Sequence, residues 1–94
     1  MGKDYSGKPI QMAVGDSAHQ GIEEVAPSSW KAEVRVGDVR LDLTRPGEIA
    51  EIKPYHEGID PFDEYQGKVR DQMQAYYQRY GVDPVYRFIL YRLA

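Results

Sequence analysis

The sequence predicts one α/β domain, of the α+β kind, with the element order helix, strand, strand, strand, helix, strand. Apolar residues recur at helical spacing in two stretches, residues 9–26 and 61–80. Between and after them lie four shorter stretches with the alternation or the β-branched and aromatic content of strands. The chain has 94 residues, of which 41% are hydrophobic, which is enough for one compact domain.

The first helix is predicted over residues 9–26, with Pro9 in its first turn and Pro27 ending it. Its apolar face is expected to consist of Ile10, Val14, Ala18, Ile22 and Val25. Three strands should follow, over residues 30–36, 39–44 and 48–53. In the second strand we expect one apolar and one polar face: Val39, Leu41 and Leu43 against Arg40, Asp42 and Thr44.

A second helix is predicted over residues 61–80. Asp60 can cap it, Pro61 suits its first position and Gly81 is a natural stop. Its apolar stripe should consist of Tyr65, Val69, Met73, Tyr76 and Tyr80. Residues 85–92 are predicted to form the last strand, and the strand–helix–strand step favours a right-handed crossover if its two strands are parallel.

Composition excludes several kinds of site. The chain has no cysteine, which rules out disulfides, thiolate zinc sites and a cysteine nucleophile. Two histidines are too few for a histidine-rich metal site, but carboxylates can hold a hard cation. The first residues of the sequence are polar and contain no apolar segment of the signal-peptide kind, and no apolar run is long enough to span a membrane. A net charge of -3 argues against nucleic-acid binding, unless the acids gather around a cation.

Asp42, Glu51 and Lys53 are the first candidate site. Side chains two apart on a strand share a face, so Glu51 and Lys53 should project together while Ile52 points into the core. If the strands pair, Asp42 and Glu51 can hold one magnesium ion, with the backbone carbonyl of Ile52 as a third ligand. Lys53 would then orient a water or stabilise charge on a phosphate. The alternative is an exposed strand face with an ordinary Glu–Lys pair, because this triplet is common by chance.

The order of elements, with Asp42 and then Glu51-Ile52-Lys53, resembles the core of the PD-(D/E)xK nucleases. The resemblance is carried by Val39-Arg40-Leu41-Asp42-Leu43 and by Glu48-Ile49-Ala50-Glu51-Ile52-Lys53-Pro54. The Glu-Ile-Lys-Pro ending is similar to restriction-endonuclease-fold toxin domains of bacterial polymorphic and type VI secretion effectors, and to the VRR-Nuc branch. Leu41 stands where the class name has proline. The resemblance implies a four-stranded mixed sheet flanked by two helices, and a DNase dependent on Mg²⁺ (or Mn²⁺).

The resemblance also implies roles for residues on the two helices. Glu23, four residues after His19 and therefore on the same helical face, would complete the metal site, whereas Glu24 points about 100° away. Gln72 and Tyr76 match a glutamine and aromatic pair of the toxin-type domains, and Gln72 could hold a phosphate oxygen or orient Lys53. A solvated helix face and a surface glutamine are the alternatives. Further candidate substrate contacts are His19, Arg40, Arg45, His56 and Tyr76, with Lys68, Arg70 and Arg79 as other possible phosphate contacts.

The same resemblance implies an antibacterial effector toxin, acting on DNA in the cytoplasm of a target cell. Residues 1–94 would be the C-terminal nuclease domain of a larger secreted effector. An immunity protein would cover the active site in the producing cell, and neither a membrane nor a small-molecule cofactor is expected as a partner. Two alternatives remain open: a phage or repair nuclease acting on branched DNA, and a catalytically silent binding domain of the same fold.

Overall fold

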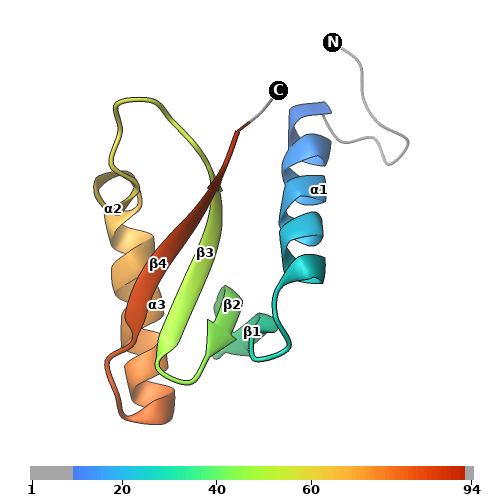
Figure 1. Cartoon of the computed structure of the whole chain (residues 1–94). Coiled ribbons are helices and arrows are strands. Elements are labelled where there is room, and N and C mark those ends of the chain that lie inside the picture. The colour runs from blue at the N-terminus through green and yellow to red at the C-terminus, as the bar shows by residue number, and fades with distance from the viewer. Residues whose placement is uncertain (1–9, 93–94) are drawn as a thin grey trace.

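The computed structural model describes the backbone of residues 10–92 and the side chains of residues 17–92. Its elements follow in this order: α1 (Ile10–Val25), β1 (Lys31–Val36), β2 (Val39–Arg45), β3 (Glu48–Pro54), α2 (Pro61–Glu64), α3 (Gln66–Tyr80) and β4 (Val85–Tyr91) (Figure 1). The predicted α+β architecture is confirmed. The helix predicted over residues 61–80 differs, because it is divided into two.

The four strands form one mixed sheet in the order β1-β2-β3-β4. The hairpins β1–β2 and β2–β3 are antiparallel, whereas β3 and β4 are parallel and are joined through α2 and α3. Gly37 and Gly47 lie in the hairpin turns with φ of 61° and 79°, the left-handed conformation that glycine adopts without steric cost. Helix α1 lies on one side of the sheet, and α2 and α3 lie on the other (Figure 1).

The second helical segment begins and ends as predicted and breaks at Tyr65. The Asp60 side chain accepts a hydrogen bond from the Phe62 amide, with Pro61 in the first position. Gly81, in the left-handed conformation, closes α3 by donating to the carbonyl of Tyr77. Tyr65 has φ of -113° and ψ of 29°, outside the helical region. Over the described residues, no helix is long and apolar enough to cross a membrane.

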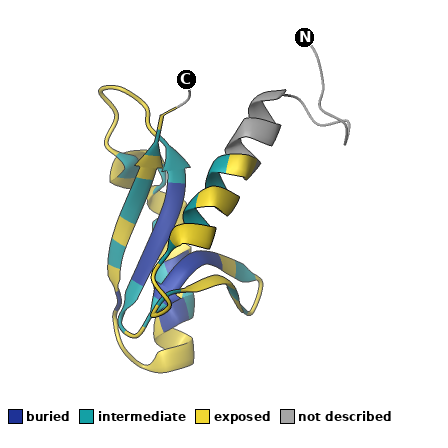
Figure 2. Ribbon diagram, turned by 45° about the vertical axis from the view of Figure 1, so that its right-hand side comes forward, coloured by how far each residue is buried: buried dark blue, intermediate teal, exposed yellow. Residues whose placement is uncertain are grey.

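Two core clusters lie on the two faces of the sheet. The cluster beneath α3 contains the buried residues Leu41, Ile49 and Tyr76. The cluster beneath α1 contains the buried residues Leu43, Ala50 and Ile52, with Ile22 and Ala26 packed against it. The prediction that Leu41 and Leu43 share a face is therefore wrong. Four consecutive residues of β2, from 41 to 44, are buried, and the centre of β3 is buried as well (Figure 2).

The helices present slightly different faces from those predicted. Ile22 packs on the sheet, but Val25 is 81% exposed, and Ala26 just beyond the helix end packs in its place. Side chains of Ile10 and Val14 lie outside the described residues. In α3, Tyr76 is buried as predicted, whereas Tyr80 is 48% exposed and Gln72 is buried instead. Each difference reflects where the partner surface ends, which helical periodicity alone does not encode.

Candidate functional site

Asp42 and Glu51 face each other across β2 and β3 and are joined through their side chains. The two acids lie next to the last regular pair of the hairpin, Leu43 with Ala50: Asp42 precedes Leu43 and Glu51 follows Ala50. The Asp42 amide donates to Glu51 Oε1 at 2.9 Å, and the Ile52 amide donates to Asp42 Oδ2 at 2.9 Å. At this point two backbone amides donate to side-chain carboxylates, whereas elsewhere between the strands amides donate to backbone carbonyls. The regular backbone pairing of β2 with β3 is interrupted here, between Leu41 and Leu43, which lie on opposite faces of the sheet.

Both carboxylates are buried. Asp42 is 2% exposed and Glu51 is fully buried. Burial raises the pKa of Glu51, the hydrogen bond from the Asp42 amide lowers it, and the charge of Asp42 raises it again. Among the described residues, Glu51 Oε2 has no hydrogen-bond partner. A buried carboxylate with an unsatisfied oxygen is costly unless a cation compensates it.

Three nitrogen-bearing side chains reach these acids from different elements. From α1, His19 Nε2 lies 3.5 Å from Asp42 Oδ2. From β2, Arg40 Nη2 lies 3.5 Å from Asp42 Oδ1, and from α3, Lys68 Nζ lies 3.6 Å from Glu51 Oε2. The Arg40 and Lys68 side chains are 49% and 42% exposed. Each is therefore partly in solvent, while its charged group lies near a buried carboxylate.

Lys53 lies beside the same acids, as strand alternation predicts. Burial lowers the pKa of its ammonium group, and the adjacent Lys68 lowers it further. The charges of Glu51 and Asp42 act in the opposite direction. The Lys53 ammonium also lies 4.9 Å from the centre of the Tyr65 ring. Two lysines, from β3 and α3, therefore stand next to two acids.

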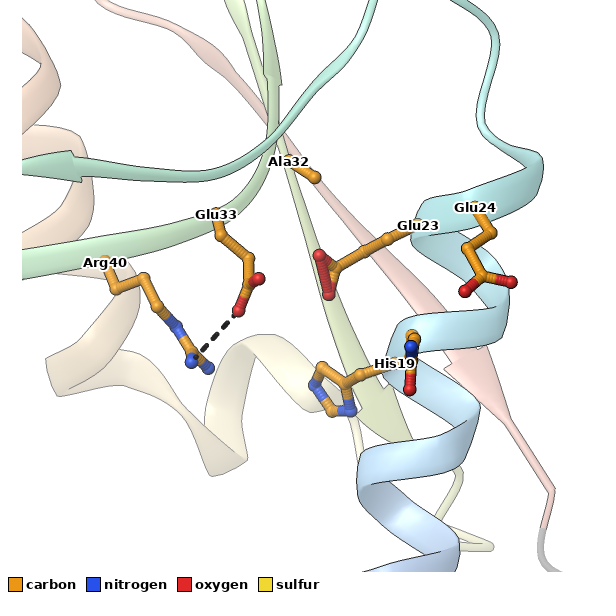
Figure 3. A pocket seen from close by; sticks show the side chains of 7 residues that line it. His19, Glu23, Glu24, Ala32, Glu33 and Arg40 are labelled. Atoms are coloured by element: carbon orange, nitrogen blue, oxygen red, sulfur yellow. Dashed lines mark ion pairs between the residues drawn. The ribbon is translucent and has the colours of Figure 1, made fainter.

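Helix α1 contributes a second group of polar residues. His19 and Glu23 are half-buried on the side facing the sheet, whereas Glu24 is exposed. Burial and the charges of Glu33 and Asp42 raise the pKa of Glu23. Figure 3 shows Glu23 directed toward Glu33, with Glu24 directed away. A cavity of about 660 Å³ is lined by His19, Gln20, Glu23, Glu24, Ala32, Glu33 and Arg40.

Glu33 is a member of this group that the sequence interpretation missed. It lies on β1 between Ala32, which pairs with Leu43, and Val34, which pairs with Leu41, and therefore opposite Asp42. Its φ is 52°, a conformation that non-glycine residues rarely adopt. Its carboxylate lies 3.5 Å from Arg40 Nη1 (Figure 3). Only the register of β1 against β2 could have revealed its position.

Gln72 is buried and holds α3 against the sheet. Its amide nitrogen donates to the carbonyl of Arg40 at 3.0 Å, and its amide oxygen accepts from the Tyr86 hydroxyl. Burial, together with the charges of Glu51 and Asp42, raises the pKa of Tyr86, so this hydroxyl stays protonated and donates. Both functional ends of Gln72 are therefore engaged within the protein. It positions the backbone of β2 two residues before Asp42.

Tyr76, one turn further along α3, is buried at the opposite end of β2. Its hydroxyl accepts a hydrogen bond from the Gly47 amide at 2.8 Å and donates to the carbonyl of Arg45 at 3.5 Å. The side chain thus secures the β2–β3 turn. These contacts are structural, and they lie at the turn rather than at the two acids.

Arg45 and His56 have partners away from the acids. The Arg45 guanidinium lies 4.6 Å from the Trp30 ring centre and bonds Glu48 at 2.9 Å. His56 Nδ1 bonds the carboxylate of Glu64 at 2.8 Å, in an exposed position beside α2. Of the five substrate contacts suggested by the sequence, the structure brings His19 and Arg40 to Asp42. Arg45, His56 and Tyr76 contact other residues.

Oxygen donors dominate the centre of the site. Over the residues that the structure describes, no three His, Cys, Asp or Glu side chains are grouped to hold a metal ion. Two adjacent carboxylates, one with an unsatisfied oxygen, are nevertheless a donor set that suits magnesium, which keeps several waters in its coordination shell. The residues therefore fit a hard divalent cation that takes only part of its ligands from protein.

No protein-family model, curated protein or solved structure matches this chain. The chemistry of the site must therefore be inferred from its own residues. Around the two buried acids lie two lysines, an arginine and a histidine.

Proposed function

We propose that the chain is an endodeoxyribonuclease with a PD-(D/E)xK core, which hydrolyses phosphodiester bonds with Mg²⁺ or Mn²⁺. The observation that carries this proposal is the buried pair of Asp42 and Glu51, held by reciprocal hydrogen bonds with Lys53 beside it. Burying two like charges side by side costs stability. A requirement to bind a cation accounts for this cost better than packing does.

In this proposal Asp42 and Glu51 would hold the metal, with the Ile52 carbonyl as a third ligand and Glu23 of α1 as a further acid at the site. When bound, the metal would polarise the phosphate as a Lewis acid and would lower the pKa of a water. Lys53 orients the attacking water or stabilises the charge that develops on the phosphate. The reciprocal hydrogen bonds fix both carboxylates before substrate arrives, which lowers the entropic cost of assembling the site.

The burial of both acids supports an enzyme over a silent binding domain of the same fold. A silent domain has no need for two adjacent buried carboxylates at the centre of its sheet. Replacement of such buried charges by apolar residues is often neutral or stabilising. Their presence beside Lys53 therefore supports catalysis.

For the biological role we propose an antibacterial effector toxin that acts in the cytoplasm of the target cell. The similarity of the Glu51-Ile52-Lys53-Pro54 stretch to effector toxin domains supports this role. An immunity protein would bind the Asp42–Glu51–Lys53 face in the producing cell and exclude DNA. Buried tyrosine and arginine anchors are the best candidates for a tight contact of this kind.

The first experiment measures cleavage of supercoiled plasmid by the purified chain. Wild type should nick and linearise the plasmid in Mg²⁺ or Mn²⁺ and should be inactive in EDTA, with little turnover in Ca²⁺. Asp42→Asn should be inactive, whereas Asp83→Asn, an exposed aspartate just before β4, should match wild type. Full cleavage in EDTA, or by folded Asp42→Asn, would contradict the proposal.

The second experiment tests the biological role by expressing the chain in bacteria alone and with its neighbouring gene. We expect growth arrest with DNA degradation, relieved by the neighbouring gene and by Asp42→Asn. A folded wild-type protein that cleaves plasmid in vitro but leaves growth unchanged would overturn the toxin role. The phage or repair nuclease would then be preferred, because it uses the same chemistry.

A further inference from the structure

Two partly exposed basic side chains, Arg40 and Lys68, lie close to the buried carboxylates and line the same cavity. Arg40 lies 3.5 Å from Asp42, and Lys68 lies 3.6 Å from Glu51. Between β2 and α3 is a cavity of about 400 Å³, lined by Asp38, Val39, Arg40, Lys68, Asp71 and Gln72. Both cationic side chains therefore border a space large enough for a phosphate group and also touch the two acids.

The pairs with the carboxylates are loose. Distances of 3.5 and 3.6 Å exceed those of charge-assisted hydrogen bonds, which are about 2.7–2.9 Å. Arg40 divides its charge between Asp42 and Glu33, at 3.5 Å from each. Lys68 is too far from Glu51 Oε2 to form a hydrogen bond, and this oxygen has no other hydrogen-bond partner among the described residues. Both cations can therefore move to a stronger acceptor at small cost.

Gln72 fixes the backbones that carry the two cations relative to each other. Its amide bonds the carbonyl of Arg40 on β2, and Lys68 lies one turn before it on α3. This partly buried hydrogen bond keeps the backbone of Arg40 next to the turn of α3 that carries Lys68. Because the two backbones are held together, both side chains can reach one anion with a smaller loss of entropy.

We infer that Arg40 and Lys68 together form the subsite that binds a DNA backbone phosphate next to the Asp42–Glu51 pair. In the free protein the same two cations partly neutralise the acids. This inference rests on the proposed function and narrows its substrate contacts. Arg45 pairs with Glu48, Arg79 stacks on Tyr80, and neither lines this cavity.

The binding test uses fluorescence anisotropy of a labelled DNA duplex in EDTA, at several salt concentrations. Lys68→Gln and Arg40→Gln should each weaken binding roughly tenfold and reduce the salt slope by about one. Lys68→Arg should keep most of the affinity. The matched control is Arg35→Gln, an exposed arginine on β1 that does not line this cavity, which should change the affinity less than twofold. Equal effects of the Lys68 and Arg35 variants would overturn the subsite.

Loss of a cation beside a buried acid can destabilise the fold, so every variant is repeated in a Glu51→Gln background. In that background Lys68→Gln should leave the melting temperature unchanged but should still weaken DNA binding. The same substitution in the wild-type background should lower the melting temperature, because Glu51 loses its cation. Equal shifts of melting temperature in both backgrounds would overturn the neutralising role.

The outcomes separate this inference from the proposed nuclease. A chain that binds DNA through Arg40 and Lys68 but cuts no plasmid in Mg²⁺ would support the subsite and overturn the nuclease. A chain that cuts plasmid while both Gln variants bind like wild type would overturn the subsite alone. If wild type had no measurable affinity for DNA, the subsite would also be overturned.

Discussion

The amide of Asp42 donates to the carboxylate of Glu51, while the carboxylate of Asp42 accepts from Ile52, the residue that follows Glu51. Each acid is therefore held by the strand of the other. These hydrogen bonds replace backbone pairing and supply partners for the carboxylates of Asp42 and Glu51. The two acids can therefore lie at the centre of a sheet whose other central residues are largely apolar.

Glu51→Gln should stabilise the protein near neutral pH. Glutamine keeps the acceptor for the Asp42 amide and removes the buried charge. The pKa of Glu51 is raised above 4.5 in the folded state, so the folded protein binds this proton more tightly than the unfolded chain. Stability from this group is thus present below the unfolded pKa and is lost as pH rises through the folded pKa. Thermal unfolding measured from acidic to neutral pH should show a smaller loss for the variant.

Glu48→Gln, on the same strand, is the control of opposite sign. A hydrogen bond from Arg45 lowers the pKa of Glu48, so its stabilisation is present above the unfolded pKa and is lost as pH falls through the folded pKa. This variant should be slightly less stable than wild type near neutral pH. If Glu51→Gln also proved less stable there, burial would not dominate the energetics of Glu51.

Lys53→Ala should lower the rate of plasmid cleavage by roughly 100-fold or more, because its ammonium lies beside the two acids. Lys31→Ala, on the exposed part of β1, should cleave like wild type. Initial rates of nicking in Mg²⁺, with circular dichroism to confirm folding, provide the measurement. A rate for Lys53→Ala within a few-fold of wild type would exclude a direct role for this lysine.

Glu23→Gln should impair cleavage more than Glu24→Gln. Both residues are on α1, but only Glu23 is half-buried and close enough to Asp42 for their charges to interact. Figure 3 shows that the Glu24 side chain is directed away from the group. The rate should be compared over a range of Mg²⁺ concentrations, and Glu23→Gln should require more metal for half-maximal rate. Identical metal dependence in the two variants would remove Glu23 from the metal site.

Gln72→Ala should reduce both stability and turnover. The substitution leaves the carbonyl of Arg40 and the hydroxyl of Tyr86 without their partner, which costs about 1–3 kcal/mol in free energy of unfolding. Gln74→Ala, exposed on the same helix, should have little effect. Urea unfolding measures the difference. A stability like that of the Gln74 variant would show that these partly buried hydrogen bonds contribute nothing.

The sequence by itself determined the order, type and approximate limits of the elements. Helical spacing, strand alternation and the residues that cap or break helices act over a few neighbouring residues. These signals can therefore be read directly from the sequence. Asp60, Pro61 and Gly81 show this, since the structure uses them at the predicted ends of a helical segment. Strand periodicity likewise placed Glu51 and Lys53 on one side, with Ile52 in the core.

Only the tertiary structure decided which of these faces are buried and which polar groups meet. Val25 fits the helical period but is exposed, and Leu41 and Leu43 belong to core clusters on opposite faces of the sheet. Contacts of Lys68 with Glu51 and of Glu33 with Arg40 join residues from different elements. Burial and charge pairing depend on surfaces brought together from distant parts of the chain. Local periodicity specifies a face, but the packing partner decides what that face contacts.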